Sequence, residues 1–92
     1  MILFNVENTS DSDARKIMDE GERILSTIPG VRRVVTGTAV QEAAGYKYTW
    51  LIEFAHRNVI ASYRDHPEHM AFANNLFRPI AGDRISIDFL QT

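Results

Sequence analysis

Hydrophobic residues in the first third of the chain follow first a strand pattern and then a helix pattern. Residues 1–6 are almost uniformly apolar and end at a polar cluster, which is typical of a buried strand followed by a turn. Apolar or small residues then recur every three or four positions from Ala14 to Ile28. This spacing predicts a helix over about residues 12–28, with Asp11 or Ser12 at its N-terminal cap and Pro29 after its end.

Alternation of apolar and polar residues marks three further strands. Residues 31–40 are rich in β-branched side chains and predict a second strand, in which Gly37 is a candidate bulge or a point of close approach. After a hairpin loop at residues 41–45, the residues from Tyr46 to Ala55 alternate strictly and predict a third strand. A loop at residues 79–83 precedes the alternation of residues 84–90, which predicts the fourth.

A helical region in two segments is predicted between the third and fourth strands. Asn58 can cap a first segment that reaches Tyr63, and Pro67 fits the first turn of a second segment that extends to about Phe77. The break between the segments then falls near His66.

The order β-α-β-β-α-β predicts an α+β, ferredoxin-like fold, in which both helices cover one face of a four-stranded antiparallel sheet. The opposite face is left bare and partly apolar. We therefore expect a second copy of the chain to cover it, which makes the protein a homodimer. Residues 1–92 are short enough to form one domain.

Composition excludes several classes of protein. Hydrophobic residues make up 45% and charged residues 24%, as in ordinary globular proteins, and the absence of cysteine removes disulfides and thiolate chemistry. No apolar run approaches the roughly 18 residues of a membrane span, and the N-terminus does not resemble a signal peptide. We expect a cytoplasmic protein without a membrane association. A net charge of -2 gives no basic field, so nucleic acid is not an expected partner.

Residues 63–69 carry the densest group of chemically active side chains: a phenol, two imidazoles and two carboxylates around the predicted helix break. His66 and His69 are three residues apart and could both reach a pocket or a metal ion if the turn is regular. The alternative is that His66 caps the second segment and His69 is satisfied locally. No third ligand stands at a supporting spacing, so we expect no metal site.

The third strand and the fourth strand supply further candidates. Tyr48, Trp50 and Ile52 lie on one face of the third strand and, with His66, are the predicted ligand-binding residues; the alternative is that the aromatic rings are core. Asp88 lies on the face opposite its neighbours, where a buried carboxylate would need a partner such as His69. The alternative is an exposed residue on an edge strand.

Several nucleotide and hydrolase motifs are missing. The sequence contains no Gly-rich phosphate loop, no G-x-S-x-G elbow and no dinucleotide fingerprint. We therefore expect no nucleotide cofactor, and we expect no cofactor of another kind.

The chain resembles the stress-responsive α/β barrel family, the Dabb proteins. Three features carry the resemblance: the strand YKYTWLIEF at residues 46–54, the block YRDHPEH at residues 63–69, and the ending IDF at residues 87–89. The spacing Y-x-x-H-P-x-H is the most specific of them. The resemblance implies a ferredoxin-like monomer whose sheet pairs with that of a two-fold mate to close a barrel.

The family includes heat-stable plant proteins, bacterial members without an assigned activity, and a plant polyketide cyclase. By motif position, the tyrosine, the second histidine and the aspartate that act in the cyclase look like Tyr63, His69 and Asp88. The cyclase also has a histidine at the start of strand one and another in strand three. This chain has no histidine at its start, and Trp50 stands where the strand-three histidine would align.

Two functions therefore stay open. As a polyketide cyclase or lyase type of enzyme, the chain would use His69 as general acid or base, with Asp88 orienting it and Tyr63 hydrogen-bonded to an enolate or carbonyl oxygen. As a binding or stress-associated module, the homodimer would hold a small apolar or aromatic molecule in a pocket between sheet and helices. The incomplete set of proton-transfer groups favours the second function.

Overall fold

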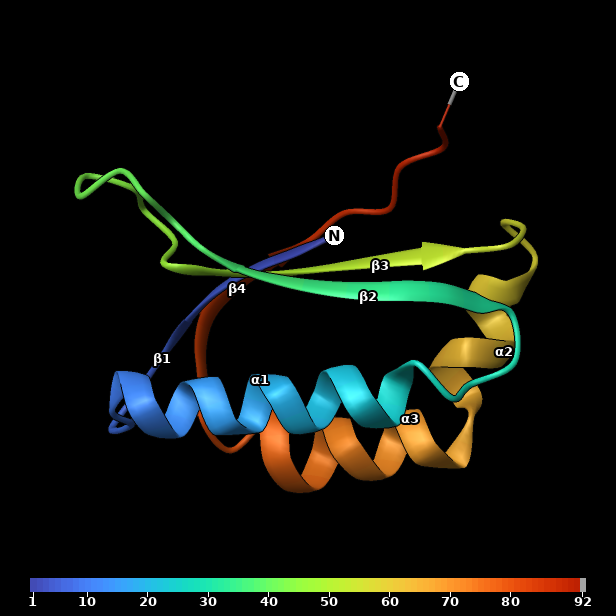
Figure 1. Ribbon diagram of the computed structural model, residues 1–92, viewed down its shortest axis with the longest axis horizontal. Helices are drawn as coiled ribbons and strands as arrows, with labels where there is room; N and C mark the ends of the chain where they lie inside the picture. The colour runs from blue at the N-terminus through green and yellow to red at the C-terminus, as the bar shows by residue number, and fades with distance from the viewer. Residues whose placement is uncertain (92) are drawn as a thin grey trace.

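The computed structural model describes residues 1–91 and has the predicted order of strands and helices (Figure 1). The elements are β1 (Ile2–Val6), α1 (Asp11–Leu25), β2 (Val31–Thr38), β3 (Tyr48–Phe54), α2 (Val59–Asp65), α3 (Pro67–Phe72), the π-helical turn η1 (Ala73–Phe77) and β4 (Ala81–Ser86).

The four strands form one antiparallel sheet in the order β2-β3-β1-β4. Helices α1 and α3 lie side by side under one face of this sheet, whereas the C-terminal segment rises on the other side (Figure 1). The architecture is the predicted α+β, ferredoxin-like fold.

Aromatic side chains from β1, β3 and the last helical turns make up the centre of the core. Trp50 is 2% exposed and Phe4 is fully buried, and their rings are stacked with centroids 6.3 Å apart. Phe77 meets Phe4 edge to face at 5.0 Å, and Phe72 meets Trp50 in the same way at 5.8 Å. Offset and edge-to-face pairs are the arrangements that the ring quadrupoles favour.

Helix α1 begins one residue earlier and ends three residues earlier than the pattern predicted. Ser10, rather than Asp11 or Ser12, is the N-cap, and its hydroxyl accepts a hydrogen bond from the amide of Asp13 at 3.1 Å. Gly21 lies where the helix crosses the core, because a Cβ there would be 2.4 Å from both Phe72 and Trp50. The absence of a side chain lets α1 approach the sheet closely.

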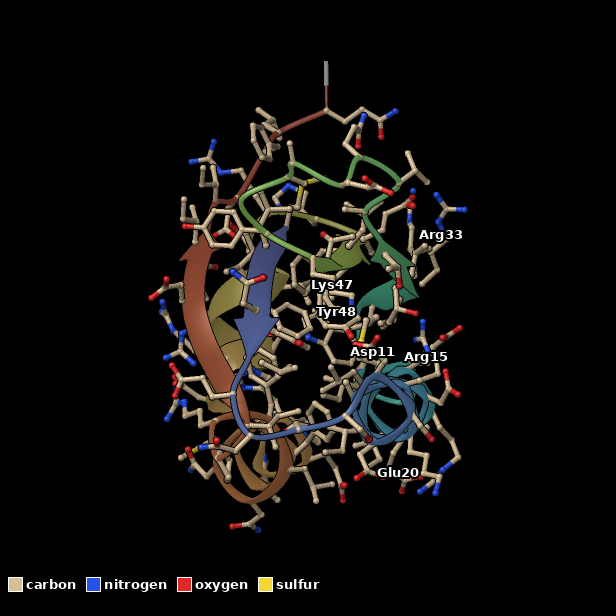
Figure 2. All side chains as sticks on the ribbon, turned by 90° about the vertical axis from the view of Figure 1, so that its left-hand side faces the viewer. Asp11, Arg15, Glu20, Arg33, Lys47 and Tyr48 are labelled. Carbon is tan, nitrogen blue, oxygen red and sulfur yellow. The ribbon has the colours of Figure 1, made fainter. Side chains whose placement is uncertain are left out.

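The start of α1 is tied to β3 by a shared carboxylate (Figure 2). Asp11 accepts hydrogen bonds from the Tyr48 hydroxyl at 2.5 Å and from Lys47 at 2.7 Å. The bond from Lys47, and to a lesser extent the bond from Tyr48, holds the pKa of Asp11 below its usual value. Burial, and to a lesser extent the bond to Asp11, raises the pKa of Tyr48. The polar end of Tyr48 is thus satisfied within the fold.

The break in the second helical region lies where proline predicted it. Residue His66 separates α2 from α3, and Pro67 is the first residue of α3. The His66 ring nitrogen Nδ1 accepts a hydrogen bond from the amide of Glu68 at 3.1 Å, so this histidine is the N-cap of α3. Asn58, in contrast, makes no side-chain cap, and the helix changes to π geometry at Ala73.

For the edge strands, the predicted bounds of the fourth strand were wrong, and Gly37 corresponds to only one of its two predicted alternatives. The fourth strand was expected at residues 84–90, but β4 pairs with β1 from Ala81 to Ser86, because a register shift between Phe4 and Val6 brings Ala81 into the ladder. The bulge in β2 is at Arg32, whereas Gly37 pairs regularly with Thr49 and is instead a point of close approach, since a Cβ there would lie 3.1 Å from the Thr49 side chain.

The sheet face opposite the helices carries Leu3, Val35, Leu51 and Ile85, and we call these four residues the open face. They alternate with residues that pack under the helices, and they form two cross-strand pairs, Leu3 with Ile85 and Val35 with Leu51. Val35 is 37% and Ile85 is 42% exposed. Within residues 1–91, no helix is long and apolar enough to cross a membrane.

Candidate functional site: a cavity between sheet and helices

A cavity of about 280 Å³ lies between the sheet and the paired helices α2 and α3. Half of its lining is apolar, from Met1, Ile2, Ile52, Phe54, Ile60 and Phe89, and half is polar, from Tyr63, Arg64, His69, Arg78, Ser86 and Asp88. Ligand pockets commonly have this composition, an apolar wall with a few polar groups that face inward.

Tyr63 enters the cavity from the buried side of α2. Its ring is 7% exposed and meets Phe54 of β3 edge to face, with centroids 5.0 Å apart. Burial raises the pKa of the phenol well above its usual value. No other group within residues 1–91 forms a hydrogen bond with this hydroxyl, which leaves it able to donate to a ligand.

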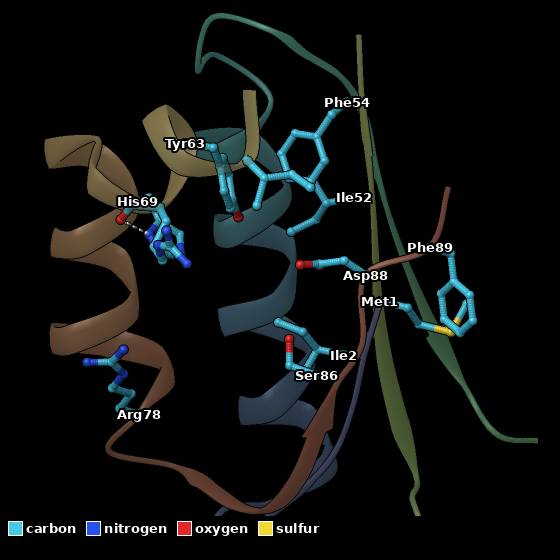
Figure 3. Close-up of a pocket in the computed structure, with 12 residues that line it drawn as sticks. Met1, Ile2, Ile52, Phe54, Tyr63, His69, Arg78, Ser86, Asp88 and Phe89 are labelled. Carbon is cyan, nitrogen blue, oxygen red and sulfur yellow. Dashed lines mark hydrogen bonds between the residues drawn. The ribbon is translucent and has the colours of Figure 1, made fainter. Parts of the chain in front are cut away.

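His69 stands beside Tyr63, on the first turns of α3. The two ring centroids are 4.5 Å apart with a tilt of 42° between the planes. Its Nδ1 is 2.9 Å from the backbone oxygen of Arg64. A carbonyl oxygen only accepts, so Nδ1 must carry the proton, and Nε2 of the neutral ring then has a free lone pair. The dashed bond in Figure 3 shows how this contact orients the ring.

Asp88 faces the two rings from the segment that follows β4. Its side chain points toward the helices, whereas the side chain of the next residue, Phe89, points to the other side (Figure 3). The structure therefore brings Tyr63, His69 and Asp88 to the walls of one cavity. It does not join Asp88 to His69 by a hydrogen bond, because Nδ1 of His69 is bound to the Arg64 carbonyl instead.

The predicted ligand-binding residues divide into two groups. Ile52 lines the cavity. Tyr48 and Trp50 are 5% and 2% exposed in the aromatic core, and His66 caps α3, so these three do not line it. For the two aromatic residues, the structure corresponds to the core alternative, since their rings pack against Phe4.

Sequence reasoning missed two arginines of the cavity, Arg64 and Arg78. Arg64 belongs to the motif block itself, directly after Tyr63, and Arg78 follows η1. Arg78 donates to the Asn74 side chain at 2.7 Å, one turn earlier. Nothing in the periodicity of the sequence indicates that a residue after the last helical turn reaches the same cavity as Asp88.

The arrangement combines a neutral phenol donor, an imidazole with one free nitrogen, a carboxylate and two guanidinium groups. These groups can orient a polar ligand atom and exchange a proton with it. Among residues 1–91, no group of three histidine or acidic side chains is placed to hold a metal ion.

The fold and the cavity define a ferredoxin-like α+β protein with a site between its sheet and its helices. The chain belongs to the family called the stress responsive A/B barrel domain, whose model matches residues 1–91. No curated protein matches the sequence.

Solved structures of other proteins share the fold. A Dabb family protein with a ferredoxin-like fold from Mesorhizobium loti superposes with a TM-score of 0.87 at 24% identity, over 99% of this chain and 92% of its own. A protein from Arabidopsis thaliana has a TM-score of 0.88 at 20% identity, over 99% and 91% of the two chains. A dimeric ferredoxin-like protein of unknown function from Thermobifida fusca has a TM-score of 0.81 at 22% identity, over 98% and 86%.

Proposed function

We propose that the protein is a single-domain homodimer that binds a small apolar or aromatic molecule in the cavity between sheet and helices. One observation carries the proposal: the Tyr63 hydroxyl and the Asp88 carboxylate face this cavity with no hydrogen-bond partner among residues 1–91. Tyr63 is buried, whereas Asp88 is an exposed residue, as in the alternative that the sequence left open, and a ligand with one or two oxygen atoms would replace the water at these groups. The apolar wall around Ile52 and Phe54 suits the rest of such a molecule.

The volume of about 280 Å³ is near the lower end of the roughly 300–1,000 Å³ that is usual for ligand pockets. It fits a compact ring compound better than a dinucleotide or a peptide. The aromatic rings of Tyr63 and Phe54 both line the cavity and can pack against the ring of such a ligand.

The open face supports the dimer. Its four apolar side chains form two cross-strand pairs on one face of the sheet, and a two-fold copy would bury them against its own. The relative from Thermobifida fusca is described as dimeric, which agrees with this arrangement.

Small phenols and aromatic acids test the binding proposal in a thermal-shift screen, followed by calorimetry on those that raise the melting temperature. Tyr63→Phe should weaken the binding of a ligand with an acceptor oxygen by about tenfold, because the phenol that donates to it is lost. Asp88→Asn should weaken the binding of a ligand with a hydroxyl by a similar factor, because the carboxylate that accepts from that hydroxyl is lost. Glu42→Gln, in the exposed loop between β2 and β3, is the matched control and should change nothing. Failure of every compound to bind would contradict the proposal.

The second candidate function is catalysis of the polyketide cyclase or lyase type. The free lone pair on Nε2 of His69 favours it, since this nitrogen could accept a proton from a carbon acid while Tyr63 donates to the enolate oxygen. His69→Gln would then abolish turnover but spare binding. A double-mutant cycle of His69→Ala and Asp88→Asn measures their coupling, and additivity within roughly 0.5 kcal/mol would show that the two act independently.

A further inference from the structure

A second and larger hollow adjoins the ligand cavity. It has a volume of about 900 Å³ and lies between the start of β2, the end of β3, the turn at residues 55–57 and the C-terminal residues 88–91, and Leu51 of the open face also lines it. Five of its lining residues also line the first cavity, namely Ile52, Phe54, Ile60, Asp88 and Phe89. The two spaces therefore share a wall, and we call the second one the arginine cavity for the side chains described next.

Positive charge is concentrated around these two spaces. Arg32, Arg33 and Arg57 line the arginine cavity, and Arg64 and Arg78 line the first cavity, so five of the ten basic residues of the chain lie here. Only two acidic residues, Glu53 and Asp88, share these walls. The local excess is positive in a chain whose net charge is -2. An anion is attracted to such a region more than to the rest of the surface.

The bulge in β2 brings two of these arginines to the same side. Successive residues of a regular strand point to opposite faces, so Arg32 and Arg33 would normally diverge. The pairing of β2 with β3 skips Arg32, since Val31 pairs with Phe54 and Arg33 with Glu53. Both arginines consequently line the arginine cavity. Bulges often redirect a side chain in this way next to a functional site.

The three arginines of this cavity differ in how far they are neutralised. Arg33 donates to Glu53 across the strands at 3.0 Å. Arg32 and Arg57 form no hydrogen bond or ion pair with another side chain of residues 1–91. Next to them, Nδ1 of His56 accepts from the amide of Asn58 at 3.1 Å, so the neutral ring carries its proton on Nε2. Two guanidinium groups and one imidazole N–H are left as donors.

We propose that the arginine cavity binds the acidic group of the ligand whose apolar part occupies the first cavity. This rests on the proposed function, and it names the class of ligand: an aromatic or aliphatic acid, with a carboxylate or a phosphate at one end. Arg32 and Arg57 bind the acid, because the guanidinium fork matches the oxygens of either group. Arg33 is held by Glu53, and its charge is already balanced. Ile52 and Phe54 line both spaces, so the two lie next to each other.

Matched probes separate the acid from the apolar part. Calorimetry would compare a series of ω-phenylalkanoates of increasing chain length with the corresponding ω-phenylalkanols and ω-phenylalkyl phosphates. The acids should bind about tenfold or more tightly than the alcohols once the chain is long enough to cross the shared wall. Added salt should weaken the binding of the acids but not the binding of the alcohols. The carboxylate and phosphate series identify which of the two acidic groups the site prefers.

The double substitution R32Q/R57Q should abolish the preference for acids and leave the affinity for alcohols unchanged. Arg23→Gln, on the exposed side of α1 and bound to Glu20, is the control and should keep the preference. If R64Q/R78Q abolishes it instead, the acid lies in the first cavity and the proposal is overturned. The proposal is also overturned if R32Q/R57Q leaves the affinity for acids unchanged and converts the dimer to a species of lower mass in sedimentation. These arginines would then stabilise the interface between the two copies.

The proposal and the function on which it rests fail in different ways. Equal affinity for acids and alcohols would overturn the acid site and leave the binding function standing. Absence of binding for all three series would overturn both.

Discussion

The rings of Tyr63 and His69 lie 4.5 Å apart, although they belong to different helices separated by a break at His66. The break makes the contact possible, since it lets α3 start in a new direction beside the end of α2. His69 then reaches back to the Arg64 carbonyl at 2.9 Å. The motif block thus contains both the two candidate site residues and the helix cap between them.

This cap should matter for stability. We expect His66→Ala to lower the free energy of unfolding by about 1 kcal/mol, because the amide of Glu68 loses its acceptor. His66→Asn should restore most of the loss, since asparagine is a good N-cap. Urea denaturation of the three proteins measures both values, and equal stabilities of the alanine and asparagine variants would show that the cap contributes nothing.

The buried phenol of Tyr63 leads us to expect a change in the free energy of unfolding at alkaline pH. Its pKa is raised above the ordinary value of 10.0 by burial, so above about pH 10 the unfolded chain loses this proton while the folded chain keeps it. The contribution of the neutral Tyr63 phenol to the free energy of unfolding is present below pH 10 and is lost as the pH rises through its raised pKa in the folded chain. The free energy of unfolding of the wild type should therefore fall more steeply above pH 10 than that of Tyr63→Phe. Parallel curves would contradict this.

Gly21 should not tolerate a side chain. In Gly21→Ala, the new Cβ would lie 2.4 Å from atoms of Phe72 and Trp50, and the resulting overpacking should cost about 1–3 kcal/mol. The matched control is Gly45→Ala in the loop before β3, where a Cβ meets no atom within 4 Å. We expect that variant to stay within about 0.5 kcal/mol of the wild type in the same denaturation experiment.

The open face predicts the effect of a charge on assembly. Val35→Glu should weaken the dimer by about tenfold or more, because two-fold symmetry places the carboxylate in the interface twice. Val40→Glu is the control, since Val40 lies in the loop after β2 and is 90% exposed. Sedimentation equilibrium would distinguish the variants. A wild-type protein that stays monomeric at micromolar concentration would contradict the dimer itself.

The sequence predicts this fold well where a local signal and the tertiary structure agree. Pro67 and His66 mark the helix break through backbone chemistry alone, and the alternation around Trp50 identifies β3. The extent of β4 was not predictable, because it depends on a register shift against β1 that no neighbouring residue in the sequence encodes.

The candidate site also has a part that the sequence predicts and a part that only the tertiary structure reveals. Tyr63 and His69 share a motif block, so their proximity could be predicted from the chain. Whether Tyr48 and Trp50 face a ligand or the core depends on which rings arrive from other elements, and Phe4, Phe72 and Phe77 fill that space. Arg64 and Arg78 were missed for a related reason: charged residues near helix ends usually point to solvent, and only the three-dimensional arrangement directs these two to a cavity.

The position of Trp50 has a practical consequence for spectroscopy. It is the single tryptophan of the chain, it is 2% exposed, and Phe4, Phe72 and Phe77 surround its ring. Its fluorescence emission should be blue-shifted in the native state and move to longer wavelength on unfolding. Since the indole lies outside both cavities, the emission wavelength reports global unfolding without a label, and a ligand that enters either cavity should leave it nearly unchanged.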